Sequence, residues 1–204
     1  MQRYMITHSL LSSWLYSMKE NPYTDSTNEP DEPMAEFLQV LRREPSPTTD
    51  AMQKGIDFEN LVTDIVCNRG DPSHKWFAAA NKVARIVRGG VLQCRSKKII
   101  QVDSMQVLLY GRLDCLKAGE IFDIKFSSKY ERGKYIDSTQ HPVYLEIVPE
   151  AMQFTYLVSN GTDVWRETYR RDETKDIRPI IGDFLSWLRA VDLLGLYKEK
   201  WLAL

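Results

Sequence analysis

Three extended runs rich in valine, isoleucine and leucine follow Gly89-Gly90 and constrain the fold more than any other feature of the chain. They cover residues 91–102, 106–117 and 120–127, and only short turns separate them. Strands joined by short turns pair as antiparallel neighbours. The last two runs meet across Lys117-Ala118-Gly119-Glu120, which has the composition of a tight hairpin turn. The sequence therefore predicts a sheet whose second and third strands form a hairpin.

Apolar residues at helical spacing precede these strands, and a second helical pattern follows them. Helices are predicted over residues 7–18, 34–43, 50–66 and 74–87, then over 149–159, and finally from about residue 175. Residues 128–148 have the composition of a long loop, and residues 163–170 that of a further strand. The order of helix, three strands, helix and strand indicates an α/β fold.

A chain of 204 residues has the usual length of one domain. We therefore expect a single domain over residues 1–204. Within it, residues 21–50 form a partly loop-like insertion and residues 172–204 a C-terminal helical extension.

Two aspartates and a lysine lie on the hairpin strands, in otherwise apolar surroundings. Asp123 and Lys125 are two residues apart, so their side chains point to the same face of a strand. The hairpin brings Asp114 of the preceding strand opposite or diagonal to Asp123. Two carboxylates on one face repel each other, and a hard divalent cation such as Mg²⁺ relieves that repulsion.

A chance origin of this pattern has to be weighed, because an Asp-x-Lys triplet occurs in roughly one chain of this size in two. The triplet could be an ordinary pair on a solvated strand face. That alternative leaves the carboxylate of Asp114 unexplained.

Two helices offer further polar groups. Glu59 borders the apolar stripe of its helix, and Gly55 lies one turn earlier on the same side, where it leaves room for a phosphate. Gln153 and Tyr156 are three residues apart on the helix predicted after the strands. Glu59 could equally be a solvent-facing helix residue, and Tyr156 could belong to the core.

These motifs, taken in order, resemble the PD-(D/E)xK nuclease superfamily, and the likeness is closest to phage lambda-type exonucleases and RecB-like nuclease domains. The matching positions span about residues 5–170 and are Ile6-Thr7-His8-Ser9, Gly55 with Glu59, Gly111-Arg112-Leu113-Asp114, Asp123-Ile124-Lys125 and Gln153. The resemblance implies a restriction-endonuclease-like αβββαβ core, with a central mixed sheet flanked by helices. One departure is that Tyr156 follows the glutamine by three residues, where RecB-type proteins place a tyrosine after four.

The resemblance also implies a Mg²⁺-dependent DNA nuclease, with exonuclease action favoured, in recombination, repair or phage replication. Glu59, Asp114, Asp123 and the carbonyl of Ile124 would hold one or two Mg²⁺ ions, with Mn²⁺ as an alternative metal. Lys125 would orient the attacking water, and Gln153 would position that water or the lysine. Contacts to DNA would come from Ser9, Arg112, Ser127, Lys129 and Tyr156.

Two other functions remain open at this point. One is a non-catalytic DNA-binding protein that keeps the nuclease fold, and the other is a restriction-like endonuclease. The expected partners are DNA, above all duplex ends, with a homo-oligomer and a separate helicase or recombination protein as further candidates. The chain contains no P-loop, so no ATP-driven motor is encoded in it.

Further expectations concern the cysteines and the cellular location. The three cysteines are widely spaced, and none lies beyond Cys115, which argues against an iron–sulfur cluster. No apolar run reaches the length of a membrane span, so a cytoplasmic protein without membrane contact is expected.

The charge of the chain is unevenly distributed, although its formal net value is −1. Residues 67–135 contain 14 Lys and Arg against 6 Asp and Glu, whereas the remainder contains 13 against 22. The segment that carries the candidate site is therefore basic, as a track for a phosphate backbone should be.

Overall fold

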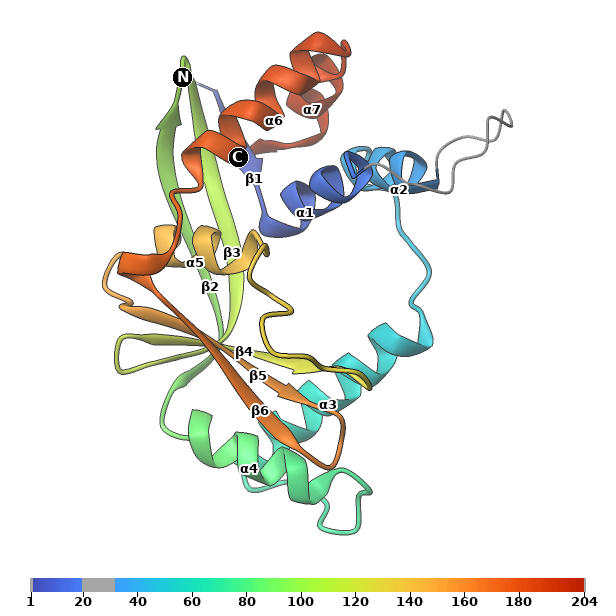
Figure 1. The fold of residues 1–204 in the computed structure, drawn as a ribbon, viewed down its shortest axis with the longest axis vertical. Coiled ribbons are helices and arrows are strands. Elements are labelled where there is room, and N and C mark those ends of the chain that lie inside the picture. The colour runs from blue at the N-terminus through green and yellow to red at the C-terminus, as the bar shows by residue number, and fades with distance from the viewer. Residues whose placement is uncertain (1, 20–31, 204) are drawn as a thin grey trace. The chain divides into compact units, whose positions relative to one another are not determined.

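The computed structural model describes residues 2–19 and 32–203 (Figure 1). Most of the loop expected within the insertion at residues 21–50 falls on residues 20–31, outside these ranges. The chain divides into two compact units. We call residues 47–96 and 112–175 the central unit, and the described parts of 1–46, 97–111 and 176–204 the terminal unit.

Hydrogen bonds join the strands of the described residues into a mixed seven-stranded sheet, in the order β6-β5-β4-β3-β1-β7, with β2 on β3. β2 (Val91–Val102) and β3 (Met105–Lys117) contribute residues to both units. The α/β class expected from the sequence, with a mixed sheet and flanking helices, is confirmed.

The terminal unit contains both ends of the described chain. Its helices are α1 (His8–Ser17), α2 (Glu32–Leu41), α6 (Arg178–Ala190) and α7 (Leu194–Lys200). Two short strands that the sequence did not predict, β1 (Arg3–Ile6) and β7 (Leu202–Ala203), pair with each other, and β1 also pairs in parallel with the start of β3. An aromatic cluster of Trp14, Phe37 and Phe184 fills its core.

The central unit has three layers. α3 (Asp50–Val66) and α4 (Phe77–Val87) lie on one side of β4 (Glu120–Phe126), β5 (Gln153–Ser159) and β6 (Val164–Arg170) (Figure 1). The core there is formed by apolar side chains of both helices and of the sheet face below them, among them Phe58, Val83, Phe122 and Leu157. α5 (Gln140–Ile147) covers the opposite face, because its first residue hydrogen-bonds Asp123, which alternates with Phe122 along β4.

The hairpin between β3 and β4 has the predicted turn. Lys117 pairs with Glu120, and the two residues between them, Ala118 and Gly119, have φ of 49° and 75°. Two consecutive positive φ angles are typical of the type I′ turn, whose twist matches that of the strands it joins.

Gly90, at the entrance to β2, has a different role. A Cβ atom there would lie 2.4 Å from the Cys115 Sγ, so only glycine permits the chain to pass this close to β3.

Several local predictions are wrong. The segment predicted as a helix over 149–159 contains strand β5, and the predicted loop over 128–148 contains helix α5. On α3, the apolar side chains of Met52 and Ile56 are 54% and 46% exposed rather than packed in the core. The Thr49 side chain caps α3 by accepting a hydrogen bond from the backbone N–H of Met52.

None of the helices in the described part of the chain combines the length and apolar character that a membrane crossing requires.

Candidate functional site

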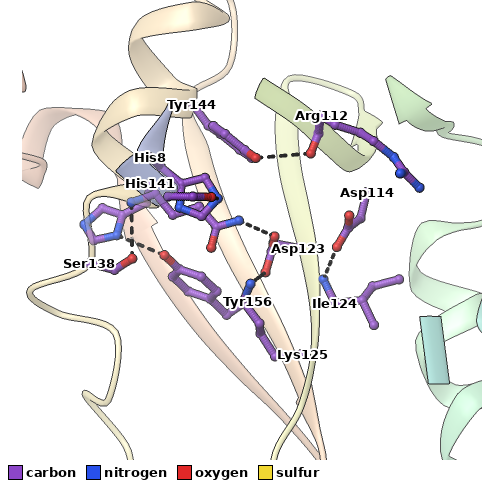
Figure 2. Close-up of polar contacts among 12 residues, drawn as sticks. His8, Arg112, Asp114, Asp123, Ile124, Lys125, Ser138, His141, Tyr144 and Tyr156 are labelled. Atoms are coloured by element: carbon purple, nitrogen blue, oxygen red, sulfur yellow. Dashed lines mark hydrogen bonds and ion pairs between the residues drawn. The ribbon is translucent and has the colours of Figure 1, made fainter. Parts of the chain in front are cut away.

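The alternation of side chains along β4 separates the core from the candidate site. Phe122 and Ile124 join the apolar core under α3 and α4. Asp123 and Lys125 therefore face the other side of the sheet. There the Asp123 side chain is only 4% exposed, and its Oδ2 lies 2.9 Å from the Lys125 Nζ, in an ion pair that Figure 2 shows.

Asp114 joins this pair from the neighbouring strand, as the sequence predicts. Cys115 pairs with Phe122 across β3 and β4, so Asp114 and Asp123 occupy the next position along the two strands. The backbone N–H of Ile124 donates to the Asp114 Oδ2 at 2.7 Å (Figure 2). This bond fixes the carboxylate beside β4 and leaves its Oδ1 atom available to a ligand.

The electrostatics of the site reflect the crowding of negative charge. Burial raises the pKa of Asp114 well above its ordinary value, and the nearby carboxylates of Asp123 and Glu59 raise it further. Burial would lower the pKa of Lys125, but the adjacent Asp123 carboxylate outweighs that effect and raises the lysine pKa to about 12. Lys125 therefore stays protonated at any physiological pH.

Gln140 is a site residue that the sequence reasoning missed. It is the first residue of α5, is 5% exposed, and donates from Nε2 to the Asp123 Oδ1 at 2.5 Å. Its backbone N–H donates to the Ser138 Oγ at 3.2 Å. The sequence carries little signal for Gln140, because nearly all side chains of α5 are buried and the segment shows no amphipathic pattern.

Gln153, the glutamine chosen from the sequence, lies at the start of β5 rather than on a helix. Its register partner is Glu120, while Asp123 pairs with Tyr156. Three residues along a strand correspond to about 10 Å, so Gln153 lies beside the first residue of β4, about 10 Å along the strand from Asp123. The arrangement does not bring Gln153 to Asp123 and Lys125.

Glu59 reaches the site from α3, where it is held by two polar neighbours. Its Oε1 accepts a short hydrogen bond from Gln93 and lies 3.8 Å from Arg112 Nη2. Gln93 also accepts from the Arg112 Nε, so the three side chains form one network. A Cβ atom at Gly55 would meet nothing within 4 Å, which agrees with the expected open space beside this part of the helix.

The loop from β4 to α5 carries two of the expected DNA contacts. Ser127 donates to the Lys129 carbonyl at 2.6 Å, and Lys134 Nζ donates to the Ser127 Oγ at 2.9 Å. The Lys129 side chain is exposed. The loop therefore presents a hydroxyl bonded to the Lys134 ammonium group, together with the exposed side chain of Lys129, next to the end of the strand that holds Lys125.

The carboxylate of Glu167, on β6, holds this loop in place through hydrogen bonds. It accepts hydrogen bonds from Tyr130, Tyr169 and the backbone N–H groups of Gly133 and Tyr135. Burial would raise the pKa of Glu167, but these four donors lower it below its ordinary value. One buried carboxylate thus organises a loop that has little regular structure of its own.

Tyr156 is fully buried on β5, which corrects its expected exposure to DNA. Its ring stacks on Tyr135 with centroids 4.3 Å apart, and its hydroxyl lies 3.3 Å from His141 Nδ1. Tyr156 therefore supports the loop and α5 from beneath. Arg112 is more exposed, and its carbonyl accepts from the Tyr144 hydroxyl at 3.2 Å (Figure 2).

Ser9 belongs to the terminal unit, in the first turn of α1, where its hydroxyl lies 3.4 Å from His8 Nε2.

The donor set of the site fits a hard divalent cation. Asp114 and Glu59 each keep one carboxylate oxygen outside the hydrogen bonds described above, and the repulsion among the three carboxylates would fall on binding a cation. Mg²⁺ retains several waters and needs only one or two direct carboxylates. Within residues 2–19 and 32–203, no three acidic, histidine or cysteine side chains already form a converged ligand set.

Comparisons with known proteins bear on the fold alone. Searches for a matching protein-family model and for a related curated protein found nothing. A solved structure titled "Crystal structure of SSO0001" is similar, with a TM-score of 0.54 and 12% sequence identity over 94% of this chain and 77% of that chain. An arrangement of elements similar to that of the present chain thus occurs in a protein of nearly unrelated sequence.

Proposed function

We propose that the chain is a metal-dependent DNA nuclease with a restriction-endonuclease-like core, and that it uses Mg²⁺ to hydrolyse phosphodiester bonds. The observation that carries the proposal is the contact of the buried Asp123 carboxylate with the half-buried Lys125, beside an Asp114 carboxylate that a backbone N–H holds in place. An ordinary surface ion pair would be exposed to water, whereas the Asp123 side chain is 4% exposed.

Burial argues that this arrangement has a function beyond stability. A buried ion pair seldom stabilises a fold more than apolar residues of the same size would. Adding a second buried carboxylate, Asp114, raises the electrostatic cost further. Groups with strongly shifted pKa values that lie together in this way are typical of catalytic and ligand-binding sites.

Asp114 and Asp123, with the carbonyl of Ile124 and with Glu59 directly or through water, would hold the cation. A bound Mg²⁺ ion supplies Lewis-acid polarisation of the phosphodiester and acidifies water at neutral pH. The carboxylates would hold the cation on the face of β4 that Asp123 and Lys125 share, and the loop carrying Ser127 and Lys129 follows this strand.

Lys125 acts as a hydrogen-bond donor and a counter-charge rather than as a general base. With a pKa of about 12 it carries no free lone pair near neutral pH, so it cannot accept a proton from water. Its ammonium group can hold a water molecule and offset the negative charge that develops on the phosphate oxygens. The hydrogen bond from Gln140 would hold the Asp123 carboxylate in position, and the ion pair with Asp123 would in turn position the Lys125 ammonium group.

The site recognises phosphate and not base sequence, which favours exonuclease action over a restriction-like endonuclease. Reading a sequence needs side chains placed in a groove of the duplex. The loop of residues 127–139 offers hydroxyl and ammonium groups, which contact phosphates.

An assay on linear, nicked and covalently closed circular duplexes, with and without Mg²⁺, tests the proposal. We expect Mg²⁺-dependent loss of the linear duplex and an intact circle. The Asp123→Asn variant should lose this activity by a factor of about 10³ or more, because the amide neither binds the cation strongly nor attracts Lys125.

Asp57→Asn is the matched control, because Asp57 is an exposed carboxylate on α3 two residues from Glu59. Its activity should equal that of the wild type. Cleavage of the circle would favour an endonuclease, and binding of DNA without cleavage under any metal would favour the non-catalytic alternative.

A further inference from the structure

Four basic side chains line an open cavity of about 550 Å³ in the central unit. The basic cavity, as we call it, is lined by Lys82, Arg85, Lys117 and Arg166, with Ile86 and Val164 completing its wall. Lys82 and Arg85 are three residues apart on α4 and so share one face of the helix. The strands β3 and β6 supply the other two cations.

One of the four cations is fixed in position. Lys117 is half-buried, and its Nζ donates to the carbonyl of Ile86 at 2.6 Å. The remaining two N–H groups of the ammonium stay free to bind an anion. The other three side chains are exposed and can move to meet a ligand.

The cations of the basic cavity have no acidic partner within the part of the chain that the structure describes. Among the described residues, the ion pairs do not include any of the four. Glu120 pairs with Lys117 across the hairpin, but its Oε1 accepts from the Thr155 hydroxyl at 2.6 Å and Glu120 does not line the cavity. The four cations repel one another, and binding of an anionic ligand would reduce that repulsion.

The basic cavity is separate from the candidate active site. Lys117 and Asp114 are three residues apart on β3, so their side chains point to opposite faces of the sheet. Cys115, on the face of Lys117, belongs to the core under α3 and α4, whereas Asp114 bonds to Ile124 next to Asp123. Any ligand of the cavity thus lies beyond the residues that would surround the cleaved bond.

We propose that the basic cavity is a second phosphate-binding site, which holds the nucleic-acid backbone away from the position of cleavage. The choice of nucleic acid over another phosphate ligand rests on the proposed function. Two arginines can form paired hydrogen bonds to phosphate oxygens, and the two lysines add compact positive charges. The cavity is open rather than enclosed, as contact with a continuous polymer requires.

Binding of a labelled linear duplex in EDTA tests this proposal, because no cleavage takes place without a metal. Lys82, Arg85 and Arg166 are replaced together by glutamine, while Lys117 is kept because it bonds to the backbone. The dissociation constant at about 0.1 M salt should rise roughly 10- to 100-fold, and the slope of log K against log salt should fall by about 2 to 3.

A matched control replaces Lys54, Lys175 and Arg189, three exposed cations outside the cavity, by glutamine. It removes the same net charge and should leave the affinity within about two-fold of the wild type. Equal losses in the two triple variants would overturn the proposal, because they would show an effect of net charge alone. Thermal unfolding of both variants establishes that they are folded.

Inorganic tripolyphosphate provides the second arm of the experiment. If it binds the wild type but not the cavity variant, while both bind duplex DNA equally, the cavity takes a small phosphate ligand and the proposal is wrong. The proposed function is tested separately. If the wild type never cleaves DNA but the cavity variant loses DNA binding, the proposed nuclease function is wrong, while the proposed phosphate-binding role of the basic cavity stands.

Discussion

Asp123 makes two contacts that together set the geometry of the candidate site. One oxygen accepts from Gln140 of α5 and the other pairs with Lys125 of its own strand. A carboxylate bound on both sides cannot rotate freely, so the lysine is held in one position. In the proposed nuclease, Gln140 would therefore act through Asp123 rather than on the substrate.

Gln140→Ala should lower Mg²⁺-dependent cleavage about 10- to 100-fold, the usual effect of losing a group that orients a metal ligand. Gln153→Ala should have no such effect, because its register partner lies three residues from Asp123 on β4. Initial rates on a linear duplex measure both. If instead the Gln153 variant loses activity and the Gln140 variant keeps it, the glutamine predicted from the sequence is the functional one.

His141 is a buried neutral base, and this makes the stability of the protein depend on pH. Its ring stacks on Tyr169 with centroids 4.0 Å apart, and burial lowers its pKa from 6.5 to about 4. The unfolded chain binds a proton below pH 6.5, but the folded chain does not until about pH 4. The contribution to stability is therefore complete above pH 6.5 and is lost as the pH falls towards 4.

Between pH 7 and pH 5 this loss amounts to about 2 kcal/mol of unfolding free energy. His141→Gln removes the titrating group. Between pH 7 and pH 5, the unfolding free energy of this variant should therefore fall less than that of the wild type, by a difference of about 2 kcal/mol. Urea unfolding at the two pH values measures the difference. Identical pH dependence in the variant and the wild type would show that the histidine does not titrate in this way.

At the scale of elements, the three strands and their hairpin were predictable because their signals are local. β2 has the predicted bounds, and the turn between β3 and β4 carries Ala118-Gly119 at its two positive φ positions. The register that places Asp114 beside Asp123 follows from that turn. The acidic part of the site could thus be found without coordinates.

The segment after the site was misread because β5 is buried on both faces. Six of its seven residues, from Phe154 to Ser159, are buried, so it has no polar alternation. A short apolar run of that kind cannot be told from a buried helix by periodicity. Pro149 and Asn160-Gly161 are typical of the two ends of a helix, but Gly161, with φ of 93°, belongs to the turn between β5 and β6.

The same error concealed Gln140. α5 has only eight residues and includes Pro142, and nearly all of its side chains are buried, so it lacks an amphipathic pattern. Its position is set by tertiary contacts, such as those of His141 with Tyr156 and Tyr169. Contacts between distant parts of the chain cannot be read from spacing.

Glu167 makes the loop between β4 and α5 depend on a single side chain. Glu167→Ala removes the acceptor of four hydrogen bonds, and we expect local opening of the loop to become easier by about 2 kcal/mol. Hydrogen exchange at the amides of Gly133 and Tyr135 should then be roughly 30-fold faster. Amides within β4 should exchange at nearly the wild-type rate.

The control for this variant is Glu173→Ala, which removes an exposed carboxylate close in sequence to β6. It should leave exchange in the loop unchanged. Equal exchange of Gly133 and Tyr135 in the wild type and the Glu167 variant would mean that the loop is ordered by other contacts.

At the scale of the whole molecule, a net charge of −1 conceals two separate arrangements of charge. The candidate site gathers acidic groups around one lysine, whereas the basic cavity gathers cations from α4, β3 and β6. The sequence predicted a basic segment at residues 67–135 but could not include Arg166, which only the fold brings to Lys82 and Arg85. The division of the chain into a terminal and a central unit was equally hidden.

The central claim is that Lys125, held by Asp123, serves Mg²⁺-dependent hydrolysis of DNA. The most direct measurement is the single-turnover cleavage rate of an end-labelled linear duplex by Lys125→Ala, compared with Lys54→Ala, a variant at an exposed lysine of α3. Circular dichroism shows whether both variants are folded, since removing the lysine leaves Asp123 without its cation. We expect a loss of about 10³-fold or more for Lys125→Ala alone. A folded Lys125→Ala variant that cleaves at the wild-type rate would contradict it.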